Sequence, residues 1–513
     1  MSPKWYPYAV GALLALYIIL LHTKTISFVT ADLGRHLKNG ELFISSGNIL
    51  HTNFYSYTEP DFPVVTHHWG SGAIFYLIWK LSGFEGLTLW YAVASGISVF
   101  FIYDASRRIS NVPFSAVSLL LAIPLIIYRI EIRPEVFSYL FFSLFVWLII
   151  LYRKKMLRFS TVSIIMLVSQ LLWVNLHVLF ILGFLVVGIS GIEYVVRKQY
   201  HEGRRWGLLI CGMTGVSLVN PFGIYGLLEP LTILRQYGYM IVENQSALFL
   251  IKRFGSGIYG YYFILAGLSI SIITLSIISS KRFGGYGFFL YSIAMFAAAL
   301  SFKYVRAFPL FGYMFSVCVP YAISLLVKKY PVSKERQAFI VAGFIGVIVW
   351  IGIGFNTVYS PLYANRFGVG LEEGVNASAE FFVKSNIRGP VFNNYDIGGY
   401  LIYHLYPEKV FVDNRPEAYS VSFFTETYIP AQESEEKWDE LMAAYDFNVI
   451  YFYRHDMTPW AQPFLIRRIA DPAWAAVYID DWTIILVRDI PENRELIETY
   501  KIPPKVFSLS GGS

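Results

Sequence analysis

Charged residues are scarce in this 513-residue sequence, where Asp, Glu, Lys and Arg together make up 15% of the chain. An ordinary soluble domain carries roughly 25%. Hydrophobic residues instead reach 56%, and Phe, Tyr and Trp alone make up 18%. This composition excludes a soluble globular protein and predicts a protein that spans a membrane many times.

Cysteine is also scarce, and the familiar signatures of soluble enzymes are missing. Cys211 and Cys318 both lie in apolar runs, so the sequence has neither a disulfide framework nor a cysteine metal site. It contains no Walker A loop, no Rossmann glycine fingerprint, no nucleophile elbow and no paired-histidine zinc helix. The energy for any reaction must therefore come from an activated substrate or a gradient, and not from ATP bound to this chain.

Charge is distributed unevenly between two parts of the chain. Residues 1–357 carry 28 Lys and Arg against 13 Asp and Glu, whereas residues 358–513 carry 13 against 22. Lys and Arg collect at the cytoplasmic ends of membrane spans, and a translocated domain can be acidic. The sequence therefore predicts a basic transmembrane body, residues 1–357, followed by an acidic soluble domain, residues 358–513. Nucleic-acid binding is not indicated.

Apolar runs predict about 11 transmembrane helices in the body. These runs lie near residues 9–21, 86–104, 112–128, 136–152, 159–174, 177–196, 206–220, 258–280, 285–300, 308–327 and 338–357. Basic residues cluster in every second loop, which places the N-terminus in the cytoplasm and the acidic domain on the extracytoplasmic side. We therefore expect a multi-pass protein of the plasma (inner) membrane with an extracytoplasmic C-terminal domain.

Two extracytoplasmic regions have the composition of folded structure. The first outer loop, residues 22–86, is rich in aromatic residues and is longer than a helix connection needs. Within it, residues 74–81 have the pattern of an amphipathic helix at the membrane interface. The acidic tail has the pattern of an α/β domain. Its expected elements are strands at 390–394, 409–413 and 448–453, helices at 398–406 and 433–445, and a hairpin of 474–479 with 482–488.

Candidate catalytic chemistry is concentrated in the first outer loop. Asp32 follows the first span, and a carboxylate beside Arg35 and His36 is suited to act as a general base or a metal ligand. The alternative is an N-cap of the helix that begins there, and the two interpretations are compatible. His67 and His68 close the loop and are candidates to line the same site. Because adjacent histidines point in different directions, packing or hydrogen bonding is the alternative to a shared ion.

A second set of charges lies at the outer ends of the spans. Its members are Arg129, Glu131, Arg133, Glu135, Glu243, Lys303 and Arg306. Ionisable groups near membrane depth usually face a cavity or a partner, and arginine binds phosphate bidentately. Arg133, Lys303 and Arg306 are therefore candidates to bind an anionic lipid-linked substrate, with Glu243 in the same set. Ion pairing within the bundle, for example of Arg133 with Glu131 or Glu135, is the alternative, as is snorkelling to the headgroups.

The sequence resembles a group of bacterial multi-span proteins assigned to the GT-C glycosyltransferase superfamily. The resemblance covers nearly the whole chain and is carried by several short segments together. These segments are Asp32–Gly40 (DLGRHLKNG), Asn53–Thr58 (NFYSYT), His67–Trp69 (HHW), Arg133–Glu135 (RPE), Trp173–His177 (WVNLH), Asn220–Gly223 (NPFG), Asn394–Leu401 (NYDIGGYL) and Val412–Arg415 (VDNR).

The resemblance implies a GT-C-like fold and a polyprenyl-phosphate-linked sugar donor that enters from the bilayer and reacts on the extracytoplasmic face. It assigns the essential carboxylate of the first outer loop to Asp32, which would act as general base or position the acceptor. The sequence departs from many members of the superfamily in lacking a second carboxylate beside Asp32. It departs from closer look-alikes in having Gly34 and Arg35 where two aromatics are usual. A divalent cation is therefore left open as a cofactor, and Arg35 is a candidate to neutralise the phosphate directly.

These observations predict a membrane glycosyltransferase, inverting or retaining, that transfers a sugar from a polyprenyl-phosphate donor to a periplasmic or cell-surface glycan, lipid or protein. Asp32 is the expected catalytic residue. The residues expected to bind substrate are Arg35, His36, His67, His68, Arg133, Glu243, Lys303 and Arg306. Asp413 and Arg415 are expected either to contact the acceptor or the first loop, or to form a buried structural ion pair.

Two other functions are carried as alternatives. One is a transporter or flippase of lipid-linked glycans, but such a protein would need charges through the middle of its spans, whereas these charges cluster near one membrane face. The other is a non-catalytic envelope scaffold whose tail binds partners. Loss of function on changing Asp32, without loss of fold, would separate an enzyme from a scaffold.

Overall fold

The fold of the chain is given by a computed structural model, in which the described residues form two compact units. The described residues are 3–233, 237–280, 284–330, 333, 343, 346 and 367–507. Unit 1 comprises Met1–Thr25, Gly86–Leu231 and Ile241–Val369. Unit 2 comprises Ile26–Glu85, Thr232–Met240 and Gly370–Ser513. The first outer loop thus packs with the tail, whereas the sequence grouped it with the transmembrane body.

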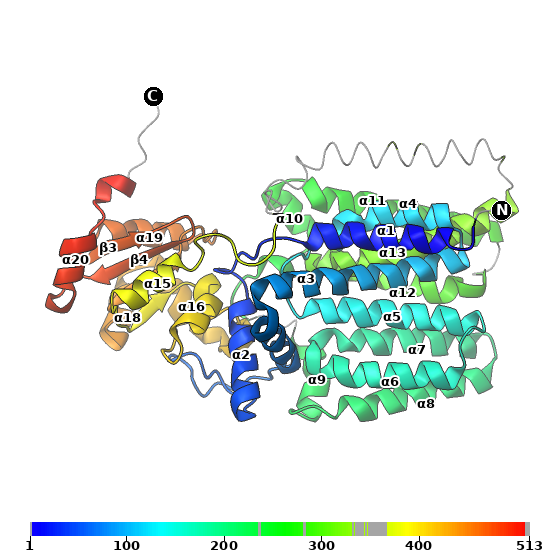
Figure 1. The fold of residues 1–513 in the computed structure, drawn as a ribbon, viewed down its shortest axis with the longest axis horizontal. Helices are drawn as coiled ribbons and strands as arrows, with labels where there is room; N and C mark the ends of the chain where they lie inside the picture. The colour runs from blue at the N-terminus through cyan, green and yellow to red at the C-terminus, as the bar shows by residue number, and fades with distance from the viewer. Residues whose placement is uncertain are drawn as a thin grey trace. The chain divides into compact units, whose positions relative to one another are not determined.

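Unit 1 is built from long apolar helices, many of which run side by side (Figure 1). Its helices are α1 (Tyr6–His22), the C-terminal part of α3 (Trp69–Ile109), α4 (Val112–Ile126), α5 (Glu135–Arg153), α6 (Phe159–Leu176), α7 (Ile181–Val196), α8 (Tyr200–Ser217), α9 (Ile224–Thr232), α10 (Ala247–Phe254), α11 (Gly257–Ser280), α12 (Gly284–Lys303) and α13 (Phe308–Lys329). Its 3-10 turns are η1 (Val178–Phe180), η2 (Val242–Asn244) and η3 (Val305–Ala307).

Seven helices in the described part of the chain are long and apolar enough to cross a membrane. They are α3, α5, α6, α7 with η1, α11, α12, and α13 with η3. Two more helices, α1 and α4, are apolar but shorter, with 17 and 15 residues. The predicted span at 206–220 overlaps α8, which is not among the seven, and the predicted span at 338–357 lies outside the described residues, apart from two glycines. The chain is therefore a polytopic helical membrane protein.

Unit 2 combines helices with one four-stranded sheet. Its elements are α2 (Leu33–Ser46), the N-terminal part of α3, α15 (Ala377–Lys384), β1 (Val391–Asn393), η4 (Tyr395–Ile397), α16 (Gly398–Leu405), η5 (Pro416–Ala418), the π-helical turn η6 (Phe423–Tyr428), α17 (Ile429–Glu433), α18 (Glu435–Tyr445), β2 (Val449–Tyr453), α19 (Ala461–Ala470), β3 (Trp474–Ile479), β4 (Thr483–Arg488), η7 (Pro491–Asn493), α20 (Arg494–Tyr500) and η8 (Pro504–Phe507). The strand order is β1-β2-β4-β3, with β1 parallel to β2 and the other pairs antiparallel. The predicted C-terminal α/β domain is confirmed.

The prediction of a strand at residues 409–413 is wrong. This segment forms its backbone hydrogen bonds with the first outer loop and not with the sheet. Val410 forms only an isolated parallel bridge, and its partner is Ser56. The Val410 N–H donates to the Tyr55 carbonyl at 2.9 Å, and the Tyr57 N–H donates to the Val410 carbonyl at 3.2 Å. The short apolar run of residues 410–412 that predicted a strand reflects burial on both sides of an extended segment, and not membership of the sheet.

Helix α3 is interrupted where the chain passes from unit 2 to unit 1. Ser82 and Gly83 have non-helical backbone angles, and Gly83 has a φ of +65°, which is a conformation that favours glycine. The part before the break contains the predicted amphipathic helix at 74–81, with Leu77 and Leu81 exposed. The part after the break is the apolar span. The glycine therefore separates an amphipathic helix from a membrane helix.

Candidate functional site

Helix α2 carries the candidate residues of the first outer loop, and glycines let it lie very close to two neighbouring helices. A Cβ atom on Gly34 would lie 2.5 Å from the carbonyl oxygen of Gly399 in α16. A Cβ atom on Gly40 would lie 2.1 Å from the carbonyl oxygen of Gly72 in α3. Larger side chains would force the helices apart. Gly34 therefore has a packing reason to be a glycine.

Arg35 projects from α2 into the interior of unit 2, where its partners are neutral. Its side chain is buried, and the residue is only 3% exposed. Nη1 lies 2.9 Å from His68 Nε2, and Nε donates to Asn414 Oδ1 at 3.4 Å. A guanidinium can only donate hydrogen bonds, so His68 Nε2 is the acceptor and carries no proton. Arg35 thus joins the two ends of the first outer loop to the tail.

Three of the five histidines of the first outer loop, His36, His67 and His68, lie together and are buried. The ring centroids of His36 and His68 are 4.6 Å apart, and those of His67 and His68 are 4.5 Å apart, both in edge-on geometry. Within the described ranges, no group of three or more His, Cys, Asp or Glu side chains is placed to hold a metal ion. The donor set therefore does not fit a divalent cation here, and the histidine rings pack against each other.

Asp32 occupies the N-cap position of α2, which was the alternative to a catalytic role, but its side chain makes no capping hydrogen bond. The side chain is only partly buried. Burial raises the pKa of the nearby Tyr395 hydroxyl, and the carboxylates of Glu417 and Asp32 raise it further. Asp32 and Glu417 thus act on the same tyrosine. The sequence did not single out Glu417, which lies 385 positions away, because only the fold brings it near.

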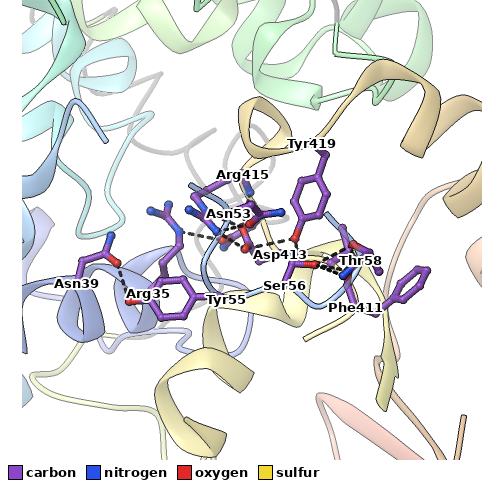
Figure 2. A network of polar contacts seen from close by, with 12 residues as sticks. Arg35, Asn39, Asn53, Tyr55, Ser56, Thr58, Phe411, Asp413, Arg415 and Tyr419 are labelled. Carbon is purple, nitrogen blue, oxygen red and sulfur yellow. Dashed lines mark hydrogen bonds and ion pairs between the residues drawn. The ribbon is translucent and has the colours of Figure 1, made fainter. Parts of the chain in front are cut away.

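Asp413 and Arg415 form a buried ion pair that also contacts the first outer loop. Arg415 donates to both carboxylate oxygens of Asp413, at 2.8 and 2.6 Å, and to Asn53 Oδ1 at 2.8 Å (Figure 2). Its guanidinium carbon lies 5.6 Å from the ring centre of Tyr55. Asp413 is 0% exposed and Arg415 is 2% exposed. Two of the predicted roles, the ion pair and the loop contact, are therefore both present.

Further hydrogen bonds hold the loop segment that follows Asn53 against the tail (Figure 2). Ser56 Oγ and Thr58 Oγ1 both donate to the Phe411 carbonyl, at 3.0 and 3.1 Å. Tyr55 donates from its hydroxyl to Asn39 Oδ1 at 2.7 Å, which connects the loop to α2. The candidate site of unit 2 is therefore held by backbone and side-chain contacts from four separate stretches of sequence.

Unit 1 contains the second candidate cluster, in which every arginine already has a carboxylate partner. Arg129 forms ion pairs with Glu135, at 3.0 Å, and with Glu243. Arg306 donates to Glu135 at 3.1 Å and to Asn244 Oδ1 at 2.9 Å. The third arginine of the cluster is Arg133, which pairs with Glu131 at 2.9 Å and with Glu243 at 3.3 Å.

The electrostatics of this cluster are those of a compensated network. Burial raises the pKa of Glu243, but Arg129, Arg133 and Arg306 outweigh that effect and lower it to about 2. Burial lowers the pKa of Arg129, but Glu243 and Glu135 hold it well above its usual value. Lys303 does not join the network, because it is exposed and lies over the Tyr304 ring at 5.1 Å. The alternative of ion pairing within the bundle therefore describes this cluster.

Comparisons with known proteins place few limits on function. No model of a known protein family matches the chain, and no curated protein matches it. Among solved structures, it is similar to a crystal structure of the Archaeoglobus fulgidus oligosaccharyltransferase in complex with Zn and sulfate. That similarity has a TM-score of 0.47 at 12% sequence identity, and it covers 95% of this chain and 74% of that chain. The functional assignment therefore depends on the residues of this chain.

Proposed function

We propose that the protein is a GT-C-type membrane glycosyltransferase that transfers a sugar from a polyprenyl-phosphate donor to a periplasmic or cell-surface acceptor. One observation carries the proposal: segments that bear the resemblance to such enzymes, and that lie far apart in sequence, meet in unit 2. Arg35 contacts His68 and Asn414. Arg415 contacts Asn53. Polar side chains from separate segments must come together in this way to form one binding site.

In this proposal Asp32 is the catalytic residue. As general base it accepts the proton of an acceptor hydroxyl, whose oxygen forms a bond to the anomeric carbon of the sugar. The bond between that carbon and the phosphate oxygen breaks, and polyprenyl phosphate leaves with the electron pair. The role is supported by the partial exposure of Asp32.

The remaining candidates are ranked by their partners. We assign four residues to the substrate site because they contact one another in unit 2: Arg35, His36, His67 and His68. The arginines of unit 1 are weaker candidates for phosphate, since an incoming anion must compete with the carboxylates that Arg133 and Arg306 already bind. Lys303 is exposed and forms no ion pair with a described carboxylate, but it does not join the cluster.

We assign the topology from the same sequence pattern that predicted the spans. The N-terminus lies in the cytoplasm, and the C-terminal domain lies on the extracytoplasmic side of the plasma membrane. The transfer reaction then takes place on that side, where the donor arrives through the bilayer. Labelling of engineered cysteines in intact cells would test this orientation directly.

The test of function is sugar transfer by the purified full-length chain in lipid. Radiolabelled polyprenyl-phosphate sugars are supplied as a panel, and a membrane extract supplies acceptors. We expect the wild type to release label from at least one donor and Asp32→Asn to lose at least about 100-fold in rate, since general-base catalysis contributes that much.

The matched control is Asp61→Asn, which changes an exposed carboxylate in the same loop. It should transfer sugar at the wild-type rate. Equal rates for wild type and Asp32→Asn would remove Asp32 from the mechanism. Absence of transfer by the wild type from every donor, with the protein folded, would overturn the proposed activity and favour the scaffold.

A further inference from the structure

Among the residues that the structure describes, Arg35 differs from the other buried arginines in having no ion pair. Four arginines in the described part of the chain are less than 9% exposed: Arg35, Arg129, Arg415 and Arg468. Arg129, Arg415 and Arg468 each pair with at least one carboxylate within 4 Å. No described carboxylate lies within 4 Å of Arg35, whose hydrogen bonds go to a histidine and an asparagine. A buried cation without a counter-ion is costly, so the protein gains if a ligand supplies one.

Glu417 is a carboxylate that acts on Arg35 from farther away, and it does not take the place of an ion-pair partner. Burial raises the pKa of Glu417, while Arg35 and Arg415 pull it down by less. Glu417 acts on Arg35 only at a distance, because no described carboxylate oxygen lies within 4 Å of the guanidinium. Arg415 already has its own partner in Asp413. The positive charge of Arg35 is therefore left only partly compensated.

Hydrogen-bond donors without partners lie around this charge. Arg35 Nη2 donates to none of the described residues, because the two bonds of the side chain use Nη1 and Nε. The Nδ2 of Asn39 is buried without a hydrogen-bond partner, and Asn39 is 7% exposed. It lies one helical turn from Arg35, on the same face of α2. The Nδ2 of Asn414 is also buried without a partner.

The amide groups are held so that they present these donors. Asn414 Oδ1 accepts from Arg35, and a guanidinium can only donate, so the orientation of that amide is set. Asn39 Oδ1 accepts from the Tyr55 hydroxyl. In both asparagines the amide oxygen accepts a hydrogen bond within the protein, and the amide nitrogen has no acceptor among the described residues. Buried donors of this kind cost free energy unless a ligand accepts from them.

We propose that Arg35, Asn39 and Asn414 form the binding site for the phosphate group of the lipid-linked donor. A phosphate carries negative charge and presents acceptor oxygens in several directions, so it can use donors from three side chains at once. This inference rests on the proposed function, which it makes more specific by naming the residues that hold the leaving group. It also assigns Asn39 and Asn414 to the site, which the sequence did not do.

The sharpest test gives Arg35 the partner it lacks. Asn414→Asp places a carboxylate beside the guanidinium, at the position where Asn414 Oδ1 now accepts. We expect the ligand-free protein to unfold at a higher temperature, because the buried charge is now paired. We expect affinity for polyprenyl phosphate to fall at least about tenfold, because the new carboxylate repels the ligand and occupies the cation. A purely structural role of Asn414 would not move the two readouts in opposite directions.

The measurement is binding of sugar-free, radiolabelled polyprenyl phosphate to the full-length protein in phosphatidylcholine nanodiscs, with thermal unfolding alongside. Arg35→Gln should lose binding and remain folded, since it removes an unpaired charge. Asn39→Ala should weaken binding several-fold. The matched control is Asn48→Asp, which adds the same charge at an exposed position after α2 and should change neither readout.

Inorganic phosphate is the second probe, because the same chemistry would suit a free anion. Binding of polyprenyl phosphate far more tightly than inorganic phosphate supports the lipid-linked ligand, and equal affinities overturn that part of the assignment. Unchanged binding in both Arg35→Gln and Asn414→Asp overturns the site. Because no sugar is present, this result is separate from turnover: the site can fail while sugar transfer succeeds, and the reverse.

Discussion

The two arginine-containing clusters of this protein solve the problem of buried charge differently. In unit 1, Glu135 and Glu243 lie among Arg129, Arg133 and Arg306, so each guanidinium has a carboxylate in contact. In unit 2, Arg35 is also buried, but among the described residues its side chain forms hydrogen bonds with a histidine and an asparagine and no ion pair. The first arrangement is complete by itself, whereas the second lacks an anion.

The difference shows why arginine content alone is a poor guide to a phosphate site. Both clusters contain arginines near polar loops, and the sequence ranked them together. A pre-formed ion pair has already offset the desolvation of its charges, so a ligand gains little by replacing one partner with another. The desolvation of an unpaired buried guanidinium has not been offset, so an anionic ligand gains the whole electrostatic interaction with it. Partners, and not the presence of arginine, distinguish the two.

The largest expected effect comes from removing the arginine of each cluster in turn. Arg129→Met leaves Glu135 and Glu243 without their shared partner, and we expect a loss of ~3–5 kcal/mol in the free energy of unfolding. Arg35→Met removes a charge that had no counter-ion, so the loss should be below ~1–2 kcal/mol, the cost of two acceptors left without a donor. Denaturant unfolding in detergent, followed by intrinsic tryptophan fluorescence, would measure both.

Equal losses for the two variants would contradict the comparison, because Arg35 would then have a partner as strong as a carboxylate. Arg454→Met serves as the control for the substitution itself. Arg454 is only partly buried, and its guanidinium donates to the Asp480 backbone carbonyl and forms no ion pair among the described residues. Its loss should be small.

A smaller loss of stability is expected from disturbing the packing of α2 against α16, because α2 positions Arg35. Gly34→Ala would place a Cβ atom 2.5 Å from the Gly399 carbonyl oxygen, so α2 must shift. We expect ~1–3 kcal/mol of destabilisation from such overpacking, together with weaker binding of polyprenyl phosphate. Thermal unfolding and the nanodisc binding assay would report the two effects.

The control for this substitution is Gly207→Ala in α8, where an added Cβ atom meets no atom within 4 Å. Alanine favours a helix over glycine, so this variant should be neutral or slightly more stable. A Gly34→Ala protein that binds ligand like the wild type would show that Arg35 does not depend on the close approach of α2 to α16.

The smallest expected effect is a difference in acid sensitivity. The pKa of Glu243 lies at about 2 in the folded protein, below its usual value of about 4.5. The cluster therefore stabilises the fold above pH 4.5, and this contribution is lost as the pH falls toward 2. We expect Glu243→Gln to remove about 1–2 kcal/mol of that acid-dependent loss. Thermal unfolding between pH 6 and pH 3 would show it as a flatter profile, and an unchanged profile would refute the assignment of this pKa.

Much of the architecture could be predicted from the sequence because it depends on local patterns. Long apolar runs located the spans of unit 1, and short apolar runs located β1, β2 and the hairpin of β3 and β4. The segment at 409–413 has a similar short apolar run but is not in the sheet, since its backbone partner is the Tyr55–Tyr57 stretch of the first loop. A partner more than 350 positions away leaves no local trace in the pattern.

The candidate site was likewise predicted only in part from the sequence. The residue types and their resemblance to a known group were enough to choose Asp32, Arg35 and the histidines, because chemistry restricts which side chains suit a charged substrate. The sequence could not tell that Arg133 and Arg306 already bind carboxylates, or that Arg35 does not. It also could not choose Asn39 or Asn414, since asparagine is common in loops and caps and carries no charge to attract notice.

The amino-acid sequence by itself determined that this chain spans a membrane and ends in an acidic α/β region, because the burial of apolar runs, in lipid or in a sheet, acts over short stretches of chain. The tertiary structure alone decided which charges are paired. Pairing depends on distances of 3–4 Å between residues that lie hundreds of positions apart, as Arg35 and Asn414 do. Those contacts decide whether a buried arginine is neutralised within the fold or is left able to bind an anion, since the free energy of a buried charge depends on its nearest partners.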